Sequence, residues 1–498
     1  MKLQGLTLFL LSTSLLSTHV LAVEDIPPSD APSWVMLNAD GRFDQWQGVG
    51  HLNAEQRCTA SLIDTRDEHS DAEADAPAYL LTSGHCVDNV AGRVVIDQPA
   101  EGDVTFNYFS DTVEQHKTYP LKTVAFSSQQ GKDLAIIELD ASLQTLIDAG
   151  IAPLRIADAA VDEGGLLLSV GAPLVDEAYT LRMATCPMLG TAELVERPYV
   201  QYGQIRFACQ DIFKGSSGGP LMSAESGEIV GVSGTSTATA DASEQCNRDA
   251  PCEIVEGQAQ WNDATHYASS TLGLNACFSA GRFDPAREHC DLAPAFTVDL
   301  GEEDYRRSQY AVLTPGEPLE WDVSFSIDTR HYWYKTARSP AQCLDSKGYG
   351  DAQAGGATRI QTPMGDEPGL YLLCVIGANL PDQSVSHGVL KNAFHFATRV
   401  VDAETPLPTA ELSVTPGEGL RQVVVLDFKR PERVRYEFKI GTPDDIDCED
   451  PEGYREMFAA VIRIGAKRLP AKLCTRAFDE AGRASPLRAD VIPSHPDA

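Results

Sequence analysis

Short apolar segments separated by turn residues recur along this chain and restrict the folds open to it. Helical periodicity is scarce, and residues 141–149 are the main exception. Many short strands with turn signals between them predict an all-β barrel or sandwich between residues 35 and 290. Examples of these segments are 94–96, 104–109, 121–126, 134–139, 166–170, 205–208 and 229–232.

The same pattern of short apolar segments continues beyond residue 290. Seven segments suit an Ig-like sandwich of about 110 residues, although Tyr371 lies three rather than two residues before Cys374, which misses the tyrosine-corner spacing by one. Residues 402–408, rich in prolines and acids, predict a linker. A second sandwich follows from about residue 409, and its close at 473–482 resembles the F–G hairpin of fibronectin-III-like modules. The segments are 296–300, 310–313, 321–327, 331–336, 358–362, 370–376 and 393–401, then 423–428, 434–440, 461–464 and 473–478.

The amino terminus has the pattern of an export signal. Lys2 precedes an apolar run over residues 3–16, and residues 20–22 offer a cleavage site. We therefore expect a signal peptide over 1–22, an extended leader over 23–34 and a secreted protein, extracellular or periplasmic. An uncleaved anchor is the alternative, but the run is short for a membrane span. No later segment approaches a span, and no hydrophobic tail ends the sequence.

Charge limits the partners. The net charge is −33, from 39 basic and 72 acidic residues, and nucleic-acid binding relies on Lys and Arg to neutralise phosphates, so we expect no nucleic-acid partner. The acidic run 64–75 could bind Ca²⁺, but it lacks a regular spacing of oxygen ligands, and a solvated insertion is favoured. The basic stretch 429–439 is similarly explained as a solvated strand face.

The cysteines indicate disulfides rather than a metal site. Twelve cysteines behind a signal peptide form an even set, which exported proteins oxidise. No C-x-x-C pair is present, so zinc is not expected, and neither is another cofactor. Pairing near neighbours keeps each bridge within one expected domain and favours Cys186–Cys209, Cys246–Cys252, Cys277–Cys290, Cys343–Cys374 and Cys448–Cys474.

One stretch, Gly215-Ser216-Ser217-Gly218-Gly219-Pro220, has the composition of a nucleophile loop. Its glycines leave the serine hydroxyl uncovered and let the backbone turn tightly enough for two amide N–H groups to converge. Two alternatives exist. The stretch also satisfies the G-x-S-x-G elbow of α/β-hydrolases, and a Gly/Ser cluster is often simply a loop.

Two other stretches complete a possible catalytic set. Thr82-Ser83-Gly84-His85-Cys86 follows an apolar strand-like run, and Asp133 begins the apolar run 134–139. Taken singly, His85 could be a core or loop histidine, and Asp133 could cap a turn. Upstream, Cys58 opens another strand-like run, 58–63, and could be purely structural.

Together these blocks resemble the chymotrypsin/trypsin-like serine peptidase family, of the bacterial extracellular type, across roughly residues 35–280. The match comprises C-x-x-x-L-I leading to T-x-x-H-C, then D-L-A-I-x-x-L, then G-x-S-G-G-P, in the order His, Asp, Ser. An α/β-hydrolase would place its serine before the acid and the histidine. The resemblance therefore implies a trypsin-like double β-barrel and removes the elbow interpretation.

The resemblance implies a role for each residue. Ser217 would be the nucleophile, His85 the general base and acid, and Asp133 the group that orients the imidazole. The backbone N–H groups of Gly215 and Ser217 would form the oxyanion hole. A Cys58–Cys86 disulfide would hold the histidine loop to its neighbouring strand.

The chain also departs from the family pattern. Ser216 stands where many members carry an acid that pairs with a new amino terminus, so activation by that ion pair is not expected.

Asp211, six residues before the nucleophile, matches a pocket-base carboxylate that would select Arg or Lys, but it could equally hydrogen-bond within its own loop. Ser233 and Gly234 would form the pocket wall and pair with substrate backbone.

These observations predict five segments: a signal peptide (1–22), a leader (23–34), a trypsin-like serine protease domain (35–292), an Ig-like β-sandwich (293–404) and a fibronectin-III-like β-sandwich (405–498). The expected function is that of a monomeric, secreted serine endopeptidase acting on a protein or peptide substrate. Its C-terminal modules would bind the substrate or a surface or matrix ligand. The alternative is a catalytically silent binding or adhesion protein with a protease fold.

Overall fold

The computed structural model describes residues 27–29, 31–66, 75–88, 93–174, 180–292, 296–300, 310–314, 319–382, 385, 387–426, 432–457 and 460–494. The expected signal peptide, residues 1–22, lies outside the described residues, as do parts of the leader, of the acidic run 64–75 and of the basic stretch 429–439. Within the described ranges, no helix is long and apolar enough to cross a membrane.

The first barrel is a ring of six antiparallel strands. β2, β3, β4, β8, β7 and β6 pair in that order, β6 returns to β2, and β5 adds to β7. The predicted helical stretch 141–149 contains α1 (Leu143–Asp148), where the Ser142 side chain accepts a hydrogen bond from the Thr145 N–H. The strands are β2 (Val49–Asn53), β3 (Arg57–Ile63), β4 (Pro77–Thr82), β5 (Val95–Pro99), β6 (Asp103–Phe106), β7 (Lys117–Ser128) and β8 (Leu134–Ser142).

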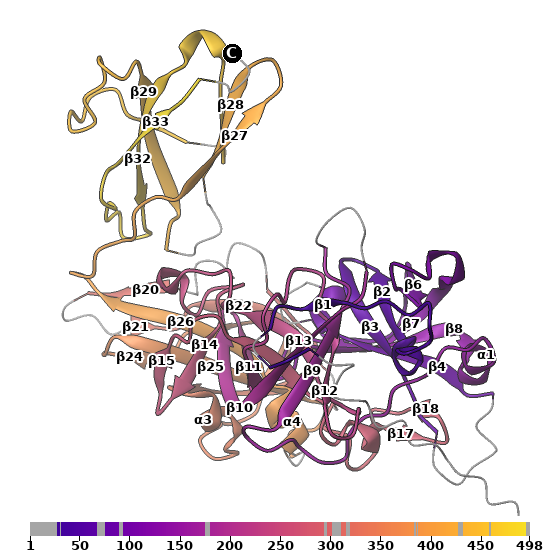
Figure 1. The fold of residues 1–498 in the computed structure, drawn as a ribbon. Coiled ribbons are helices and arrows are strands. Elements are labelled where there is room, and N and C mark those ends of the chain that lie inside the picture. The colour runs from indigo at the N-terminus through magenta and orange to yellow at the C-terminus, as the bar shows by residue number, and fades with distance from the viewer. Residues whose placement is uncertain are drawn as a thin grey trace, which may run out of the picture.

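A second ring of six strands follows. β9, β10, β11, β16, β13 and β12 close on β9, and β10 also pairs with β1 and with β14 of the β14–β15 hairpin. The two rings confirm the expected all-β double barrel (Figure 1). The strands are β1 (Trp34–Val35), β9 (Leu166–Gly171), β10 (Arg182–Glu196), β11 (Tyr199–Phe207), β12 (Pro220–Ser223), β13 (Ile229–Ser236), β14 (Cys252–Val255), β15 (Gln258–Gln260) and β16 (His266–Ser270).

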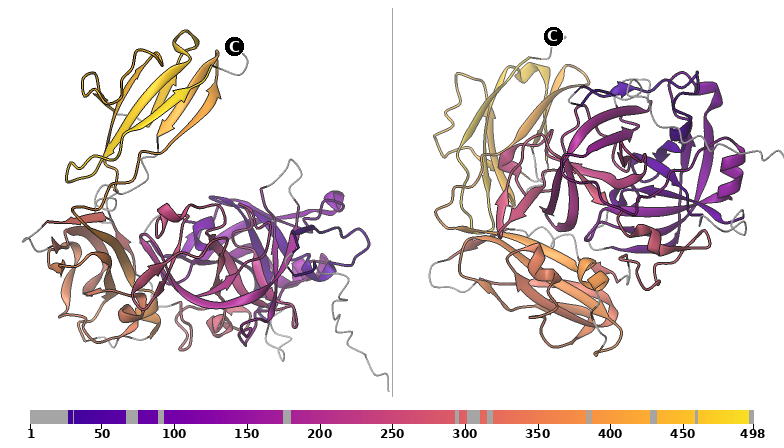
Figure 2. Two further views of the ribbon diagram at one scale, coloured as in Figure 1. Left: turned by 60° about the vertical axis from the view of Figure 1, so that its left-hand side comes forward. Right: turned by 60° about the horizontal axis from the view of Figure 1, so that its bottom comes forward.

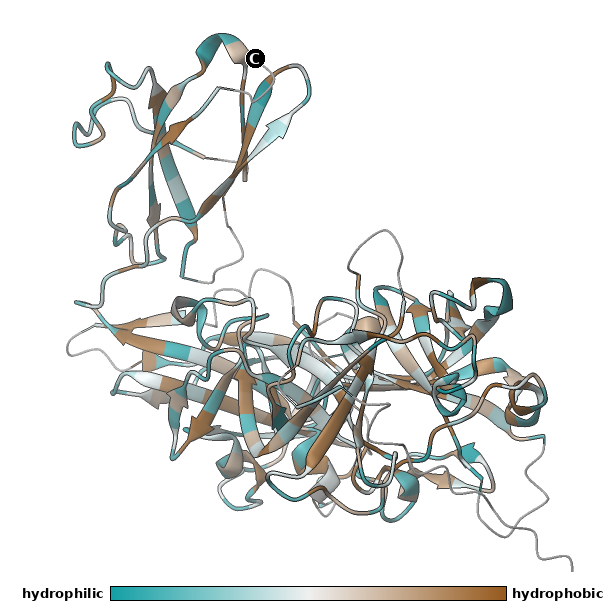
Figure 3. Cartoon of the chain, viewed as in Figure 1, coloured by the Kyte–Doolittle hydropathy of each residue, from teal (hydrophilic) through white to brown (hydrophobic). Residues whose placement is uncertain are grey.

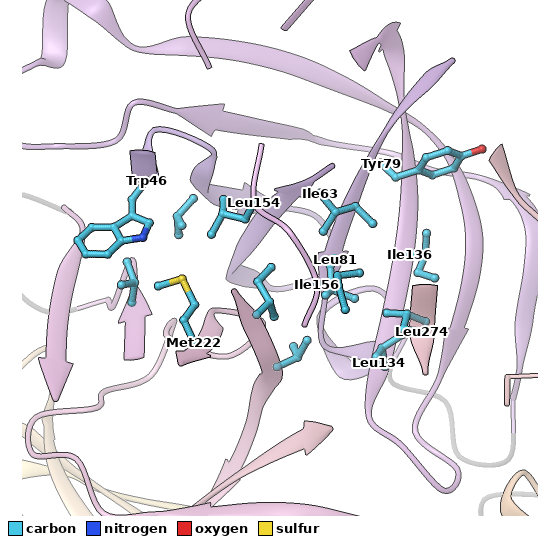
Figure 4. Close-up of a cluster of buried hydrophobic side chains, with 14 of the residues drawn as sticks. Trp46, Ile63, Tyr79, Leu81, Leu134, Ile136, Leu154, Ile156, Met222 and Leu274 are labelled. Atoms are coloured by element: carbon cyan, nitrogen blue, oxygen red, sulfur yellow. The ribbon is translucent and has the colours of Figure 1, made fainter. Parts of the chain in front are cut away.

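The two barrels share one apolar core. Hydrophobic residues lie mainly along the strands, while many loops are hydrophilic (Figure 3). Ile63 and Leu81 of the first barrel belong to the same buried cluster as Met222 and Ile229 of the second. Figure 4 shows this cluster, with Trp46 at one end and Tyr79 at the other. Such burial contributes about 25 cal/mol per Å² of apolar surface, and this contribution holds the two barrels against each other.

After the barrels, two short strands, β17 (Phe278–Ser279) and β18 (Arg282–Phe283), lead to a third unit built on one large sheet. Its strand order is β19-β22-β25-β26-β20, with β23 beside β22 and a small β21–β24 pair apart. The expected segments 321–327 and 331–336 form one strand, β22, because its pairing with β23 continues past an irregularity between Ile327 and His331. The elements are β19 (Val298–Asp299), β20 (Tyr310–Leu313), β21 (Leu319–Glu320), β22 (Val323–Ala337), α3 (Pro340–Leu344), β23 (Gln353–Ile360), β24 (Pro363–Gly365), β25 (Gly369–Ala378), α4 (His387–Lys391) and β26 (Phe394–Asp402).

The C-terminal unit packs a three-stranded sheet, β27-β28-β31, on a four-stranded sheet, β30-β29-β32-β33. Its core joins Val424 and Ile464 of the first sheet to Tyr436 and Leu473 of the second. This unit projects from the rest of the molecule in two views (Figures 1 and 2). The strands are β27 (Leu412–Gly417), β28 (Arg421–Leu426), β29 (Arg435–Gly441), β30 (Arg455–Glu456), β31 (Val461–Ile464), β32 (Ala471–Phe478) and β33 (Arg488–Ile492).

The third unit packs directly on the second barrel. One buried cluster contains Val195 and Val200 of the barrel together with Leu372 and Ala397 of the third unit. The Tyr202 hydroxyl lies 2.7 Å from His395 Nε2 in the same buried interface. The second barrel therefore buries apolar surface against a domain that follows it in sequence.

Candidate active site

His85 lies on a 3₁₀ turn, Gly84–Cys86, that follows β4. The turn sits tightly against the first barrel, since a Cβ at position 84 would lie 2.1 Å from the carbonyl oxygen of Ser128. Only glycine permits that approach. The Cys58–Cys86 disulfide ties the turn to β3, so the histidine is held from both sides.

Asp133 binds His85 through both carboxylate oxygens. Oδ2 lies 2.6 Å from the imidazole Nδ1, and Oδ1 accepts the His85 backbone N–H at 2.9 Å. The Asp133 N–H donates to Ser269 Oγ at 3.0 Å, which fixes the loop before β8 to the second barrel. The Asp133 side chain is only 5% exposed, against 20% for His85. Water therefore reaches the imidazole while the carboxylate stays covered.

Opposing effects set the pKa of His85. Burial lowers it, but the charge and hydrogen bond of Asp133 raise it more, and the net pKa lies above the usual 6.5. Glu196, on β10, adds to the rise, whereas Arg248 opposes it. This environment stabilises an imidazolium, the form a general base takes after it accepts a proton.

The nucleophile loop turns through Gly218. Its φ is +80°, and a Cβ there would lie 2.0 Å from the Thr82 hydroxyl oxygen. The Gly218 N–H donates to the Ser233 carbonyl at 2.8 Å, and the Gly219 N–H donates to the Ser216 carbonyl at 2.9 Å. The loop thus brings Ser217 against β4, the strand that leads into the histidine turn.

Two backbone donors of this loop remain available. The N–H groups of Ser216, Gly218 and Gly219 all donate to carbonyl oxygens. Within the described ranges, the N–H groups of Gly215 and Ser217 have no such acceptor. The two groups expected to form an oxyanion hole are therefore free to bind a developing negative charge.

Thr59 is a site residue that sequence reasoning missed. It is fully buried on β3, and its N–H donates to the Ser217 carbonyl at 2.8 Å. Its hydroxyl donates to the Gly215 carbonyl and accepts from the Ala172 N–H, both at 2.8 Å. Thr59 thus holds the loop by both of the residues that carry the free donors. Its place directly after Cys58 is the only sequence signal that could have drawn attention to it.

Ser233 and Gly234 lie on β13, beside the proposed catalytic groups. Ser217 Oγ is 3.5 Å from the Gly234 carbonyl, and a Cβ at position 234 would lie 3.2 Å from Asp133 Oδ2. The Ser233 carbonyl accepts the Ser83 hydroxyl at 2.8 Å. Within the part of the chain that the structure describes, no hydrogen bond joins His85 to Ser217. Such bonds are often long without substrate and tighten in the complex.

Asp211 does not occupy a buried pocket. Asp211 is exposed and has a φ of +59°, and its backbone carbonyl accepts a hydrogen bond from the Ser33 hydroxyl at 3.3 Å. Phe213 and Lys214, which follow it, are exposed as well. The structure therefore places this carboxylate in a surface turn, not at the enclosed base that an Arg or Lys pocket would require.

All six disulfides join the pairs that the sequence favoured, and the described residues include no free cysteine. The two groups of described residues with metal-ligand proximity, Cys58 with His85 and Cys86, and Cys343 with Cys374 and His395, each contain one of these bridges. Oxidised sulfurs are not thiolate ligands, so neither group is a candidate metal site.

Comparison with known families decides the class of the double barrel. Residues 60–232, which include His85, Asp133 and Ser217, match the family model described as "Trypsin-like peptidase domain". This region is a trypsin-like peptidase domain. Its match supports a hydrolase of the serine protease type.

Several solved structures are similar to about half of this chain. Rv3671c from M. tuberculosis H37Rv, in an inactive form, is 15% identical over 49% of this chain and 90% of its own (TM-score 0.30). Neuropsin, a serine protease expressed in the limbic system of mouse brain, is 14% identical over 48% of this chain and 93% of its own (TM-score 0.29). Human heparin binding protein is 13% identical over 48% of this chain and 90% of its own (TM-score 0.30). At these TM-scores we draw no conclusion from them. No curated protein matches the sequence significantly.

Proposed function

We propose that the chain is a secreted serine endopeptidase that cleaves peptide bonds through an acyl-enzyme. The observation that carries this proposal is the His85–Asp133 pair, with Nδ1 and Oδ2 2.6 Å apart, next to a loop whose Gly215 and Ser217 N–H groups are free. The family match supports the same assignment. In this proposal, residues 35–292 form the protease domain, and residues 293–404 and 405–498 form two C-terminal modules, which the sequence predicts as β-sandwiches.

The mechanism follows from the geometry. Asp133 holds Nδ1 protonated, which leaves Nε2 of His85 to accept the Ser217 hydroxyl proton as Oγ attacks the substrate carbonyl. The negative charge on the carbonyl oxygen is stabilised by the N–H groups of Gly215 and Ser217. His85 then protonates the leaving amine, and water hydrolyses the acyl-enzyme by the same steps in reverse order.

The direct test is Ser217→Ala, with Ser216→Ala as the matched control one residue away. We expect Ser217→Ala to lower kcat/KM for a peptide substrate by about 10⁴-fold or more, because the nucleophile is lost while binding remains. Ser216→Ala should retain most of the activity. Reaction with a fluorophosphonate, followed by mass spectrometry, should modify the wild type at Ser217. A wild type that neither cleaves nor reacts would favour a catalytically silent binding protein.

Selectivity for Arg or Lys at the cleaved position would depend on Asp211. Because this residue is exposed, screening by water weakens its attraction for a substrate cation. We expect Asp211→Asn to change the ratio of kcat/KM between Arg and Leu substrates by less than about tenfold. A peptide-library cleavage profile of both proteins measures this ratio, and a larger change would establish Asp211 as the pocket carboxylate.

The C-terminal modules are proposed to bind a substrate protein or a surface ligand. The projecting position of the last module supports this role, since it leaves much of that module's surface exposed (Figure 2). Removing residues 405–498 and comparing hydrolysis of a small peptide with that of a protein separates the roles. If the last module binds the substrate protein, its removal should slow hydrolysis of the protein and leave hydrolysis of the small peptide unchanged.

A further inference from the structure

A cavity of about 510 Å³ lies where the second barrel meets the third unit. Its lining includes apolar side chains from three sources: Val161 from the connection between the barrels, Met188, Ile205 and Val230 from the barrel strands, and Leu344 from α3. Leu272, 45% exposed, is another lining residue. The volume falls in the range of small-molecule sites, which are mostly apolar with a few polar groups.

The cavity is separate from the candidate active site. His85, Asp133 and Ser217 are not among its lining residues, whereas Gly131 and Lys132, directly before Asp133, are. A ligand here would therefore lie behind the proposed catalytic acid and away from the substrate. Its existence does not depend on the proposed function.

Lys132 is a cationic side chain in the lining of this cavity. Nearby, Lys391 Nζ is 2.6 Å from Asp291 Oδ2, and Asn392 Nδ2 donates to the Asp291 carbonyl at 3.0 Å. In the described part of the chain, Lys132 Nζ has no hydrogen bond or ion pair. Burial, with repulsion from Lys391, lowers its pKa to about 8, so the amine is still mostly protonated at neutral pH.

Glu193 determines what kind of anion would be accepted. Its Oε2 is buried without a partner, and burial raises the pKa of its carboxyl to about 7. A dianion such as phosphate would meet a partly ionised carboxylate and only one unpaired ammonium. A monoanion is the better match, because the other two charged lining residues, Asp291 and Lys391, form an ion pair with each other.

We propose that this cavity binds a small apolar carboxylate, with its carboxylate on the Lys132 ammonium and its hydrocarbon part along Val161, Met188 and Leu272. An ion pair shielded from water by an apolar wall is stronger than one on the surface. The hydrocarbon part would cover a wall that water now contacts.

The test is calorimetric titration of the full-length, disulfide-intact protein with decanoate at pH 7. We expect saturable binding with one site per chain and a Kd below about 0.3 mM. Decanol, which lacks the charge, should bind at least tenfold more weakly. Absence of saturable decanoate binding to a folded wild type would overturn the proposal, as would decanol binding equally well.

Two variants locate the site. Lys132→Met keeps the apolar stem and should weaken decanoate binding at least tenfold, while Lys122→Met on the first barrel's surface is the matched control and should leave it unchanged. Leu272→Glu adds a negative charge at an exposed lining position, where folding tolerates it, and should also weaken binding at least tenfold. Unchanged affinity in both Lys132→Met and Leu272→Glu would place the ligand elsewhere and overturn the proposal.

Discussion

The His85–Asp133 pair gives the proposed chemistry a defined response to pH. Burial lowers the pKa of His85, but Asp133 raises it to a net value above 6.5. Since only the neutral imidazole accepts a proton, kcat/KM should fall in acid with a midpoint above pH 6.5. Initial rates between pH 5 and 9 measure this midpoint. Asp133→Asn should lower both the midpoint and the rate, the latter by about 10⁴-fold.

The same pair contributes to stability with a definite sign. A folded pKa above the unfolded value means that this contribution is fully present below about pH 6.5 and is lost as the pH rises through the folded pKa. Denaturant unfolding of wild type and Asp133→Asn at pH values on both sides of the folded pKa measures this contribution. A difference in the free energy of unfolding between the two proteins that grows towards alkaline pH would contradict the assignment.

Thr59 permits a test of positioning as distinct from catalysis. Thr59→Val removes the hydroxyl that joins the Gly215 carbonyl to the Ala172 N–H, and two buried groups lose a partner at a cost of about 1–3 kcal/mol. We expect kcat to fall about tenfold or more with little change in KM, because the loss affects the oxyanion donors.

The matched control is Thr118→Val, whose hydroxyl pairs with Thr105 at the surface. It should change neither kcat nor stability noticeably. Equal kcat values for Thr59→Val and wild type would show that the loop holds its shape without the hydrogen bonds of the Thr59 hydroxyl.

Single residues also mark the limit of sequence reasoning. His85, Asp133 and Ser217 could be selected because each stands in a motif with a chemical reason for its neighbours. Thr59 has no such motif, and its role depends on three chain segments that meet only after folding. Asp211 shows the opposite error: a spacing suggested a buried carboxylate, but a left-handed turn places it at the surface.

At the scale of elements, the nucleophile turn depends on one glycine. Gly218→Ala would place a methyl group 2.0 Å from the Thr82 hydroxyl at a φ of +80°, so the turn must shift. We expect activity to fall about 100-fold or more, with a lower Tm. Gly227→Ala, in a turn with φ +73° and open space around it, is the control: backbone strain alone should lower Tm and leave activity near wild type.

Element boundaries show what short-range patterns miss. Short apolar segments between turn residues correctly placed most strands of the two rings, but they divided β22 of the third unit into two. The division followed the polar residues between Ile327 and His331, where the strand passes through an irregularity without leaving the sheet. Pairing with β23 and β25 decides continuity there, and those partners are distant in sequence.

For the whole molecule, the interface between the second barrel and the third unit predicts how the chain can be shortened. Ending the chain after residue 292 would expose Val195, Val200 and Tyr202, which the third unit now covers. We expect that fragment to aggregate or unfold at a lower temperature than the full chain. Ending after residue 404 keeps this interface and should preserve Tm and peptide hydrolysis. Differential scanning calorimetry and light scattering compare the two.

The number of β-rich units was visible in the sequence, yet their packing was not. In the sequence, apolar residues such as Val195 and Leu372 fit equally well as core residues of their own domains. Only the structure shows that they belong to one buried cluster, because a strand pattern identifies a buried face without identifying what covers it.

That shared face has a consequence for experiments in which this protein is cleaved. The contacts between Tyr202 and His395, and between Lys391 and Asp291, do not require an intact connecting backbone. A preparation nicked between barrel and module would run as two bands under denaturing, reducing conditions and elute from a sizing column as a single particle. Counting bands would then understate how much of the protein is still assembled.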